Sequence, residues 1–156
     1  MLLIDVADYT TGGSMKYVIV YWSRYGNNKR LVEHLAGTLK KKGADTQVLT
    51  TDETNPSAIP KADFYVFSAA AEQFSLNRNM KGFMNNLESM DGKKYGIINT
   101  HGLKNSKLPK MEKLLSKKNM LKVSEIDFRV TGDTQHGNGL PSGWEAQLDA
   151  FATKLK

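Results

Sequence analysis

Hydrophobic residues follow two alternating patterns along the chain: short continuous runs, and longer stretches with helical spacing. Residues 17–22 form a continuous apolar and aromatic run, and residues 29–42 place their apolar side chains on one helical face, with Gly43 at the end. The continuous run predicts a strand that is covered on both faces of a parallel sheet. The second pattern predicts an amphipathic helix closed by a glycine cap.

The same alternation continues to the carboxyl terminus. Further strands are predicted at residues 46–50, 64–68, 95–99 and 123–130. Four further helices are predicted. The first is short, at residues 56–61, and the second carries an apolar face from Met80 to Met90. The third begins at Pro109, and the fourth begins with Ser142 and Glu145 in the S-x-x-E relation of a capping box. Five strands alternating with five helices predict an open, doubly wound parallel sheet with helices on both faces.

Apolar and charged residues alternate within residues 123–130, which predicts a strand with one wet face at an edge of the sheet. Ligands in doubly wound sheets bind beyond the carboxyl ends of the strands, where the strand order reverses. Three loops leave the central strands at that edge, namely residues 23–28, 69–77 and 100–107. All three consist mainly of polar or small residues, as a binding site requires.

Length and composition restrict the class of protein. The chain has 156 residues, 40% of them hydrophobic, which suits one compact domain. We expect this domain to span residues 15–156, because residues 1–14 end in Gly12, Gly13 and Ser14 and resemble a leader or linker. The absence of cysteine excludes disulfides, thiolate catalysis and zinc–thiolate sites, and it fits a reducing cytoplasm. No apolar run approaches the roughly 20 residues of a membrane span, so we expect a soluble cytoplasmic protein.

The charge balance favours acidic partners. Lys and Arg number 22 against 16 Asp and Glu, a net charge of +6. Many of the lysines cluster at the ends of predicted helices, where they complement the helix dipole. No Arg-rich stripe with interleaved aromatic residues accompanies them, so nucleic-acid binding is not expected.

The first loop, Ser-Arg-Tyr-Gly-Asn-Asn, has the clearest chemistry. The helix that follows presents unpaired main-chain N–H groups, Gly26 lets the backbone bend closely around an anion, and Ser23, Asn27 and Asn28 offer side-chain hydrogen bonds. A phosphate is the natural ligand of such a loop. The alternative is that an asparagine only caps the helix and Gly26 only turns the chain. The loop is neither a Walker A sequence nor a G-x-G-x-x-G fingerprint.

This loop resembles the phosphate loop of flavodoxins, S/T-x-T-G-x-T. Ser23, Gly26 and Asn27 fit that pattern, whereas Tyr25 and Asn28 stand where threonines are usual. The resemblance covers residues 15–156 in the order and length of the elements. It implies a flavodoxin-like three-layer α/β fold, with five parallel strands in the order 2-1-3-4-5 and helices on both faces.

The resemblance also implies that the cofactor is FMN, with its ring between the second and third loops. The expected cofactor-binding residues are Ser23, Arg24, Tyr25, Gly26, Asn27 and Asn28 in the first loop, Ala69, Ala70, Ala71, Glu72, Gln73 and Phe74 in the second, and Thr100, His101, Gly102 and Leu103 in the third. No catalytic residue and no metal ligand set is identified.

The three histidines carry different expectations. Near the ring, the imidazole of His101 would favour the anionic reduced flavin and so raise the reduction potential of the flavin. The alternative is that His101 is a solvent-exposed loop histidine. His136 is a weaker candidate for contact with the cofactor, and His34 is expected at the surface.

The leading hypothesis is an FMN-dependent electron carrier, a monomer or weak dimer that exchanges electrons with redox proteins whose docking surfaces are acidic. Whether the protein is also an enzyme stays open. One alternative is a flavodoxin-like oxidoreductase that acts on a quinone or a porphyrin precursor, although only residues 131–142 are available for the extra loop of such relatives. The other alternative is a flavodoxin-like binding module that has lost FMN.

Overall fold

The predicted parallel sheet is present. The computed structural model describes residues 14–156, so nearly all of the predicted leader lies outside the described residues. The strands are β1 Lys16–Tyr21, β2 Asp45–Thr50, β3 Phe64–Glu72, β4 Ser75–Leu76, β5 Lys94–His101 and β6 Leu121–Arg129. Five of them run parallel in the order β2-β1-β3-β5-β6, and the two-residue β4 pairs antiparallel with β3 alone. With β4 set aside, this is the predicted order 2-1-3-4-5.

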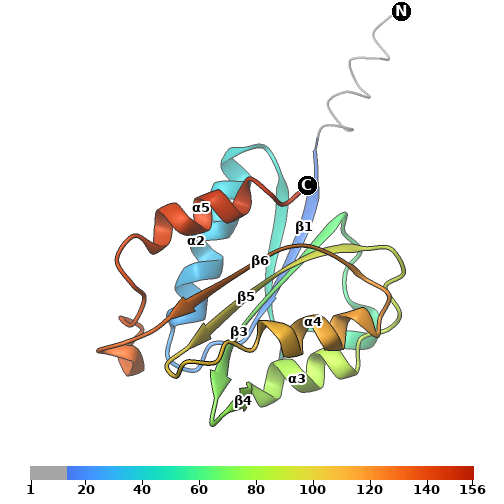
Figure 1. Ribbon diagram of the computed structural model, residues 1–156. Helices are drawn as coiled ribbons and strands as arrows, with labels where there is room; N and C mark the ends of the chain where they lie inside the picture. The colour runs from blue at the N-terminus through green and yellow to red at the C-terminus, as the bar shows by residue number, and fades with distance from the viewer. Residues whose placement is uncertain (1–13) are drawn as a thin grey trace, which may run out of the picture.

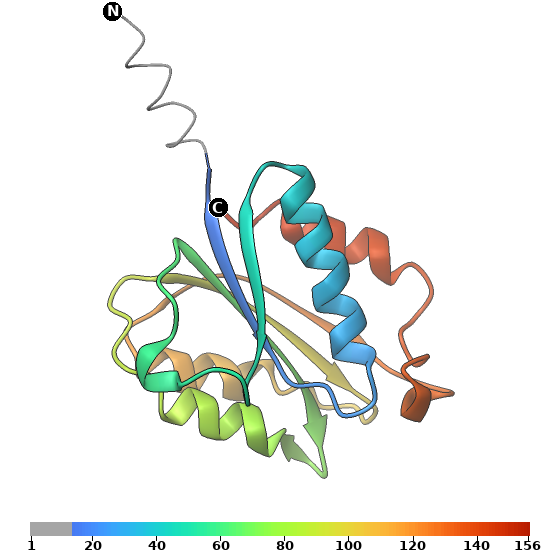
Figure 2. The ribbon, with the colours of Figure 1, turned by 180° about the vertical axis from the view of Figure 1, so that it is seen from behind.

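Helices cover both faces of the sheet. They are α2 Asn27–Lys41, α3 Arg78–Asn85, α4 Leu108–Ser116 and α5 Trp144–Ala152, with the short 3₁₀ turns η1 Pro56–Ala58 and η2 Thr134–His136. Helices α2 and α5 lie on one face, and α3 and α4 lie on the other (Figures 1 and 2). Alternate residues of β1 serve the two layers: Tyr17 and Ile19 pack beneath α2 and α5, whereas Val18 and Val20 pack beneath α3 and α4. The continuous apolar run is therefore explained by burial on both faces.

Three local predictions about helices were inaccurate. The short helix expected at 56–61 is only the three-residue turn η1. Helix α3 ends at Asn85, so Leu87 and Met90 are buried in the segment after the helix rather than on its face. The capping box was wrong, because Gly143, at φ 82°, occupies the N-cap position of α5 and no side chain caps that helix.

The segment 69–77 is not a loop throughout. Strand β3 continues to Glu72, because Ala69 and Ala70 stay paired with β5, and the chain then turns at Gln73 and Phe74 to form a hairpin with β4. Both turn residues have positive φ, 48° and 68°. The hairpin projects beyond the carboxyl edge of the sheet, beside the start of α3 (Figure 1).

The edge strand was predicted correctly: among the described strands β6 pairs only with β5, and it exposes Glu125 and Asp127 while it buries Phe128. Within residues 14–156, no helix combines the length and the apolar character that a membrane span requires.

Candidate functional site

The first loop bends at Gly26 and leads directly into α2. Gly26 takes φ 103° at the N-cap position, a conformation that side chains disfavour. The hydroxyl of Ser23 accepts hydrogen bonds from the main-chain N–H groups of Gly26 at 3.0 Å and Lys29 at 3.1 Å. The N–H groups of Tyr25, Asn27 and Asn28 donate to no acceptor within residues 14–156. The loop thus keeps three main-chain donors available at a helix N-terminus, where the dipole attracts anions.

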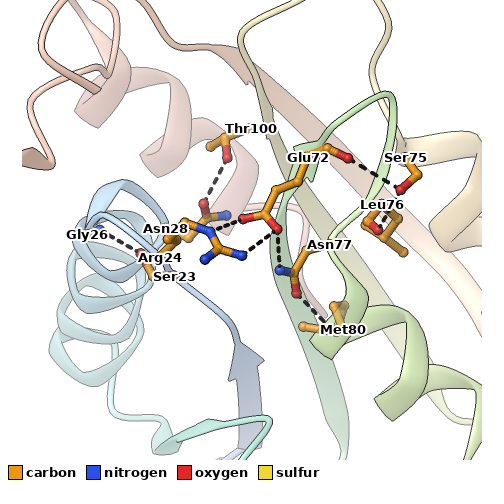
Figure 3. A network of polar contacts seen from close by, with 10 residues as sticks. All are labelled: Ser23, Arg24, Gly26, Asn28, Glu72, Ser75, Leu76, Asn77, Met80 and Thr100. Atoms are coloured by element: carbon orange, nitrogen blue, oxygen red, sulfur yellow. Dashed lines mark hydrogen bonds and ion pairs between the residues drawn. The ribbon is translucent and has the colours of Figure 1, made fainter. Parts of the chain in front are cut away.

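Asn28 is buried and braces the loop against the sheet. Its amide nitrogen donates to the hydroxyl of Ser68 at 3.0 Å. Its amide oxygen accepts from the hydroxyl of Thr100 at 2.8 Å, the contact drawn in Figure 3. Only 2% of Asn28 is exposed. The side chain that stands in place of a threonine therefore ties the start of α2 to the ends of β3 and β5, and it is not free to bind a ligand.

Asn27 and Arg30 attach the loop between β6 and α5 to the same helix start. The Asn27 amide donates to the carbonyl of Thr134 and accepts from the N–H of Gly139, both at 3.0 Å. Arg30 donates to the carbonyl of Gly137 at 3.0 Å. The backbones are in close contact here, since a Cβ atom on Gly137 would lie 2.9 Å from the carbonyl oxygen of Tyr25. The glycine-rich loop is therefore packed directly on the first loop.

An ion pair links the first loop to the hairpin. Arg24 makes two hydrogen bonds to the carboxylate of Glu72, Nε to Oε2 at 2.9 Å and a terminal nitrogen to Oε1 at 3.0 Å (Figure 3). Asn77 donates to the same carboxylate at 3.0 Å and caps α3 by accepting from the N–H of Met80. The hydrogen bond from Arg24 lowers the pKa of Glu72, and partial burial opposes this shift. Arg24 lines the pocket, as predicted for a cofactor-binding residue, and its guanidinium is paired there with Glu72.

His101 is buried rather than exposed. It is the last residue of β5, and 7% of its side chain is accessible. Its Nδ1 lies 2.5 Å from the carbonyl oxygen of Leu103, and its Nε2 lies 2.7 Å from a carboxylate oxygen of Asp127. Both ring nitrogens are thus engaged by oxygen atoms of the protein. The alternative of a solvent-exposed histidine is wrong.

The other histidines also make specific contacts. His34, expected at the surface, is half-buried between Asp149, 2.8 Å from its Nε2, and the edge of the Trp144 ring. The hydrogen bond from His34 lowers the pKa of Asp149. His136 is exposed and contacts Asp133 in its own loop.

A pocket of about 200 Å³ lies where the three loops meet. Eleven of the residues predicted for the site line it, namely Ser23, Arg24, Tyr25, Asn27, Asn28, Ala70, Ala71, Glu72, Thr100, His101 and Gly102. Five do not: Gly26, Ala69, Gln73, Phe74 and Leu103. Phe74 and Leu103 instead expose 81% and 55% of their surface on the hairpin and the third loop.

Sequence reasoning missed Val130 and Thr134, which complete the pocket from the end of β6 and the loop after it. The only signal was the glycine-rich composition of that loop, which suggested that it passes close to a ligand. Nothing in the sequence shows that Asn27 fastens it there.

The donor set fits a phosphate group. Three main-chain N–H groups without a protein acceptor belong to residues that line the pocket or bend around it. The pocket volume corresponds to roughly seven water molecules, enough for a phosphate with part of a polyol chain. A tricyclic ring would have to lie outside it, toward the hairpin and the third loop.

Solved structures with a similar fold are flavodoxins and larger proteins that contain such a domain. A flavodoxin of Streptococcus pneumoniae has a TM-score of 0.74 at 19% identity, with 90% of this chain and 97% of that chain covered. The fold is flavodoxin-like. A two-electron reduced flavodoxin of Megasphaera elsdenii has a TM-score of 0.70 at 20% identity, over 88% of this chain and 98% of that chain.

The flavodoxin-like fold also matches part of a longer protein. The rubredoxin oxygen:oxidoreductase of Desulfovibrio gigas has a TM-score of 0.75 at 14% identity, over 90% of this chain but only 35% of that chain. The sequence matches no protein-family model and no curated protein.

Proposed function

We propose that this protein binds FMN at the meeting point of its three loops and transfers electrons between redox partner proteins. The observation that carries the proposal is the set of free main-chain N–H groups of Tyr25, Asn27 and Asn28 at the start of α2. These donors lie at the sheet edge where the strand order reverses, between β1 and β3, which is where doubly wound folds bind ligands. The flavodoxin-like fold supports the same ligand.

In this proposal the chain provides binding, orientation and charge. The free N–H groups hold the phosphate, and the small side chains of Ala70 and Ala71 let the backbone approach the polyol chain. When bound, FMN supplies the one- and two-electron redox chemistry. The His101 ring lies at the pocket wall, and both of its nitrogens face oxygen atoms of the protein. It is therefore held by the protein rather than by a hydrogen bond to the flavin.

Apolar side chains are available to cover the ring. Phe74 and Leu103 are exposed on the two segments between which the ring would lie. Burial of an aromatic side chain of this size against the ring removes apolar surface from water on both partners. Loss of Phe74 should therefore speed the dissociation of FMN.

A second candidate function, a flavodoxin-like binding module without FMN, is favoured by one observation. The polar side chains of the first loop are already satisfied: Ser23 by two N–H groups of its own loop, and Asn27 and Asn28 by neighbouring elements. In this reading the loop serves only to join β1 to α2.

Titration of the flavin-free protein with FMN and with riboflavin separates the two functions. The electron-transfer proposal expects FMN to bind at least roughly tenfold tighter than riboflavin, because one charge-assisted hydrogen bond is worth about 1.5–3 kcal/mol. Gly26→Val should abolish this preference. Gly43→Val is the matched control, since Gly43 also has positive φ and lies far along the chain at the end of α2. If FMN fails to bind, or binds no better than riboflavin, the proposal is refuted and the binding module remains.

A further inference from the structure

A second and larger hollow shares a wall with the pocket. This groove has a volume of about 830 Å³ and is formed by the first loop, the β3–β4 hairpin and the first turn of α3. The two hollows share the lining residues Arg24, Tyr25, Ala71 and Glu72, so the Arg24–Glu72 ion pair belongs to the wall between them. Figure 3 shows this ion pair. No residue of β5 or of the third loop lines the groove, which distinguishes it from the pocket proposed for the flavin phosphate.

The groove carries an excess of positive charge. Arg24, Arg78 and Lys81 line it together with a single carboxylate, that of Glu72. The carboxylate of Glu72 already accepts two hydrogen bonds from Arg24. Arg78 and Lys81 form no ion pair within residues 14–156. Two cationic side chains are thus left to interact with an anionic group that enters the groove.

Exposed aromatic surface adjoins these cations. Tyr25 lines the groove and exposes 47% of its surface. Aromatic anchors beside charged groups are typical of protein interfaces. A free inorganic anion would use the cations but not this apolar surface.

A further hollow adjoins the groove. A neighbouring hollow of about 310 Å³ shares Arg78 and Asn79 with it. This second hollow is also lined by Asp52, so the excess of positive charge is confined to the groove itself. Two adjoining hollows suit an extended segment better than a single small ion.

We propose that this groove receives an acidic segment of a protein partner, with its carboxylates on Arg78 and Lys81 and an apolar residue beside Tyr25. That the partner is a redox protein rests on the electron-transfer function proposed above, whereas the binding of an acidic segment does not. A partner docked here would lie against the wall of the flavin pocket, separated from it by the Arg24–Glu72 ion pair.

The test measures binding of a fluorescein-labelled octaglutamate peptide to the flavin-free full chain at low salt. Arg78→Gln/Lys81→Gln should weaken binding about tenfold, because each exposed ion pair that is lost costs a factor of about three. The matched control is Lys40→Gln/Lys41→Gln, which removes the same charge from exposed residues at the end of α2. Amide shifts in ¹⁵N NMR spectra should concentrate at Ser75, Arg78 and Asn79.

Four results would overturn the proposal. Equal weakening by the Lys40/Lys41 control would show attraction to net charge alone. Displacement of the peptide by millimolar inorganic phosphate with the same amide shifts would assign the groove to small anions. Tighter binding of an oligothymidylate than of the peptide would assign it to nucleic acid, and absence of peptide binding would remove the site. FMN titration of Arg78→Gln/Lys81→Gln reports separately on the flavin pocket, because neither residue lines it.

Discussion

Substitution of Gly137 by alanine tests how strongly the β6–α5 loop holds the first loop in place. Gly137 has φ 74°, and an added Cβ atom would lie 2.9 Å from the carbonyl oxygen of Tyr25, closer than van der Waals contact allows. Two costs are expected. Alanine in the left-handed region costs about 1–2 kcal/mol, and forcing a methyl group into a packed contact costs about 1–3 kcal/mol more. The expected loss of stability is therefore about 2–5 kcal/mol.

The chain supplies controls that separate these two costs. Gly92 has the same φ of 74° and Gly132, in the same loop as Gly137, has 71°, yet a Cβ atom at either would meet nothing within 4 Å. Gly92→Ala and Gly132→Ala should show only the backbone cost of about 1–2 kcal/mol. The excess for Gly137→Ala measures the contact between the two loops.

Urea unfolding followed by tryptophan fluorescence gives the three free energies, provided that the slope with urea stays unchanged. FMN titration of the same variants should show weaker binding for Gly137→Ala alone, because only that change displaces the carbonyl of Tyr25 and the loop around it. Equal destabilisation by all three substitutions would refute the reasoning, as would an FMN affinity that Gly137→Ala leaves intact.

Two further predictions concern the side chains that brace the site. Asn28→Ala should lower the free energy of unfolding by about 2–4 kcal/mol, because it leaves the buried hydroxyl groups of Ser68 and Thr100 without their hydrogen-bond partner. The loss should be smaller in a Thr100→Val background, where one of these hydroxyl groups is already absent. The control Asn85→Ala, at an exposed position, should change the free energy of unfolding by less than about 0.5 kcal/mol. The lowered pKa of Glu72 predicts that the Arg24–Glu72 ion pair stabilises the fold fully above the ordinary pKa of 4.5 and that this stabilisation is lost as pH falls through the lowered pKa. The Tm difference between wild type and Glu72→Gln should therefore be largest near pH 7 and shrink in acid, and a constant difference from pH 7 to pH 3 would contradict it.

Hydrophobic spacing was enough to predict the sheet because each central strand is buried on both faces. The runs around Val18, Val66 and Ile97 contain no polar interruption, and only a parallel sheet covered by helices accommodates several such runs in one small domain. The strand order then follows from right-handed crossovers and from the resemblance of the first loop. The extent of β3 was missed, because the turn at Gln73 and Phe74 has positive φ without the glycine or asparagine that signals such a turn.

The contacts within the site were beyond sequence reasoning for a different reason. Arg24 and Glu72 are 48 residues apart, and Asn27 meets Thr134 across 107 residues. Such pairs are fixed only once the whole sheet has assembled, and arginine or asparagine at these positions is equally compatible with exposure to solvent. The sequence located the loops that carry the site, but it could not assign the partner of any side chain.

The first loop divides its polar groups between two tasks, and this division determines how the site should respond to mutation. A threonine at position 28 would present one hydroxyl group, whereas the longer amide of Asn28 reaches both Ser68 and Thr100 and fixes the helix start to two strands. The anion binding proposed for this loop then depends on main-chain N–H groups, which among substitutions only proline removes. Changes at Asn28 should therefore lower stability and leave the N–H donors in the chain, whereas changes that move the backbone, at Gly26 or Gly137, should lower anion affinity in addition to stability.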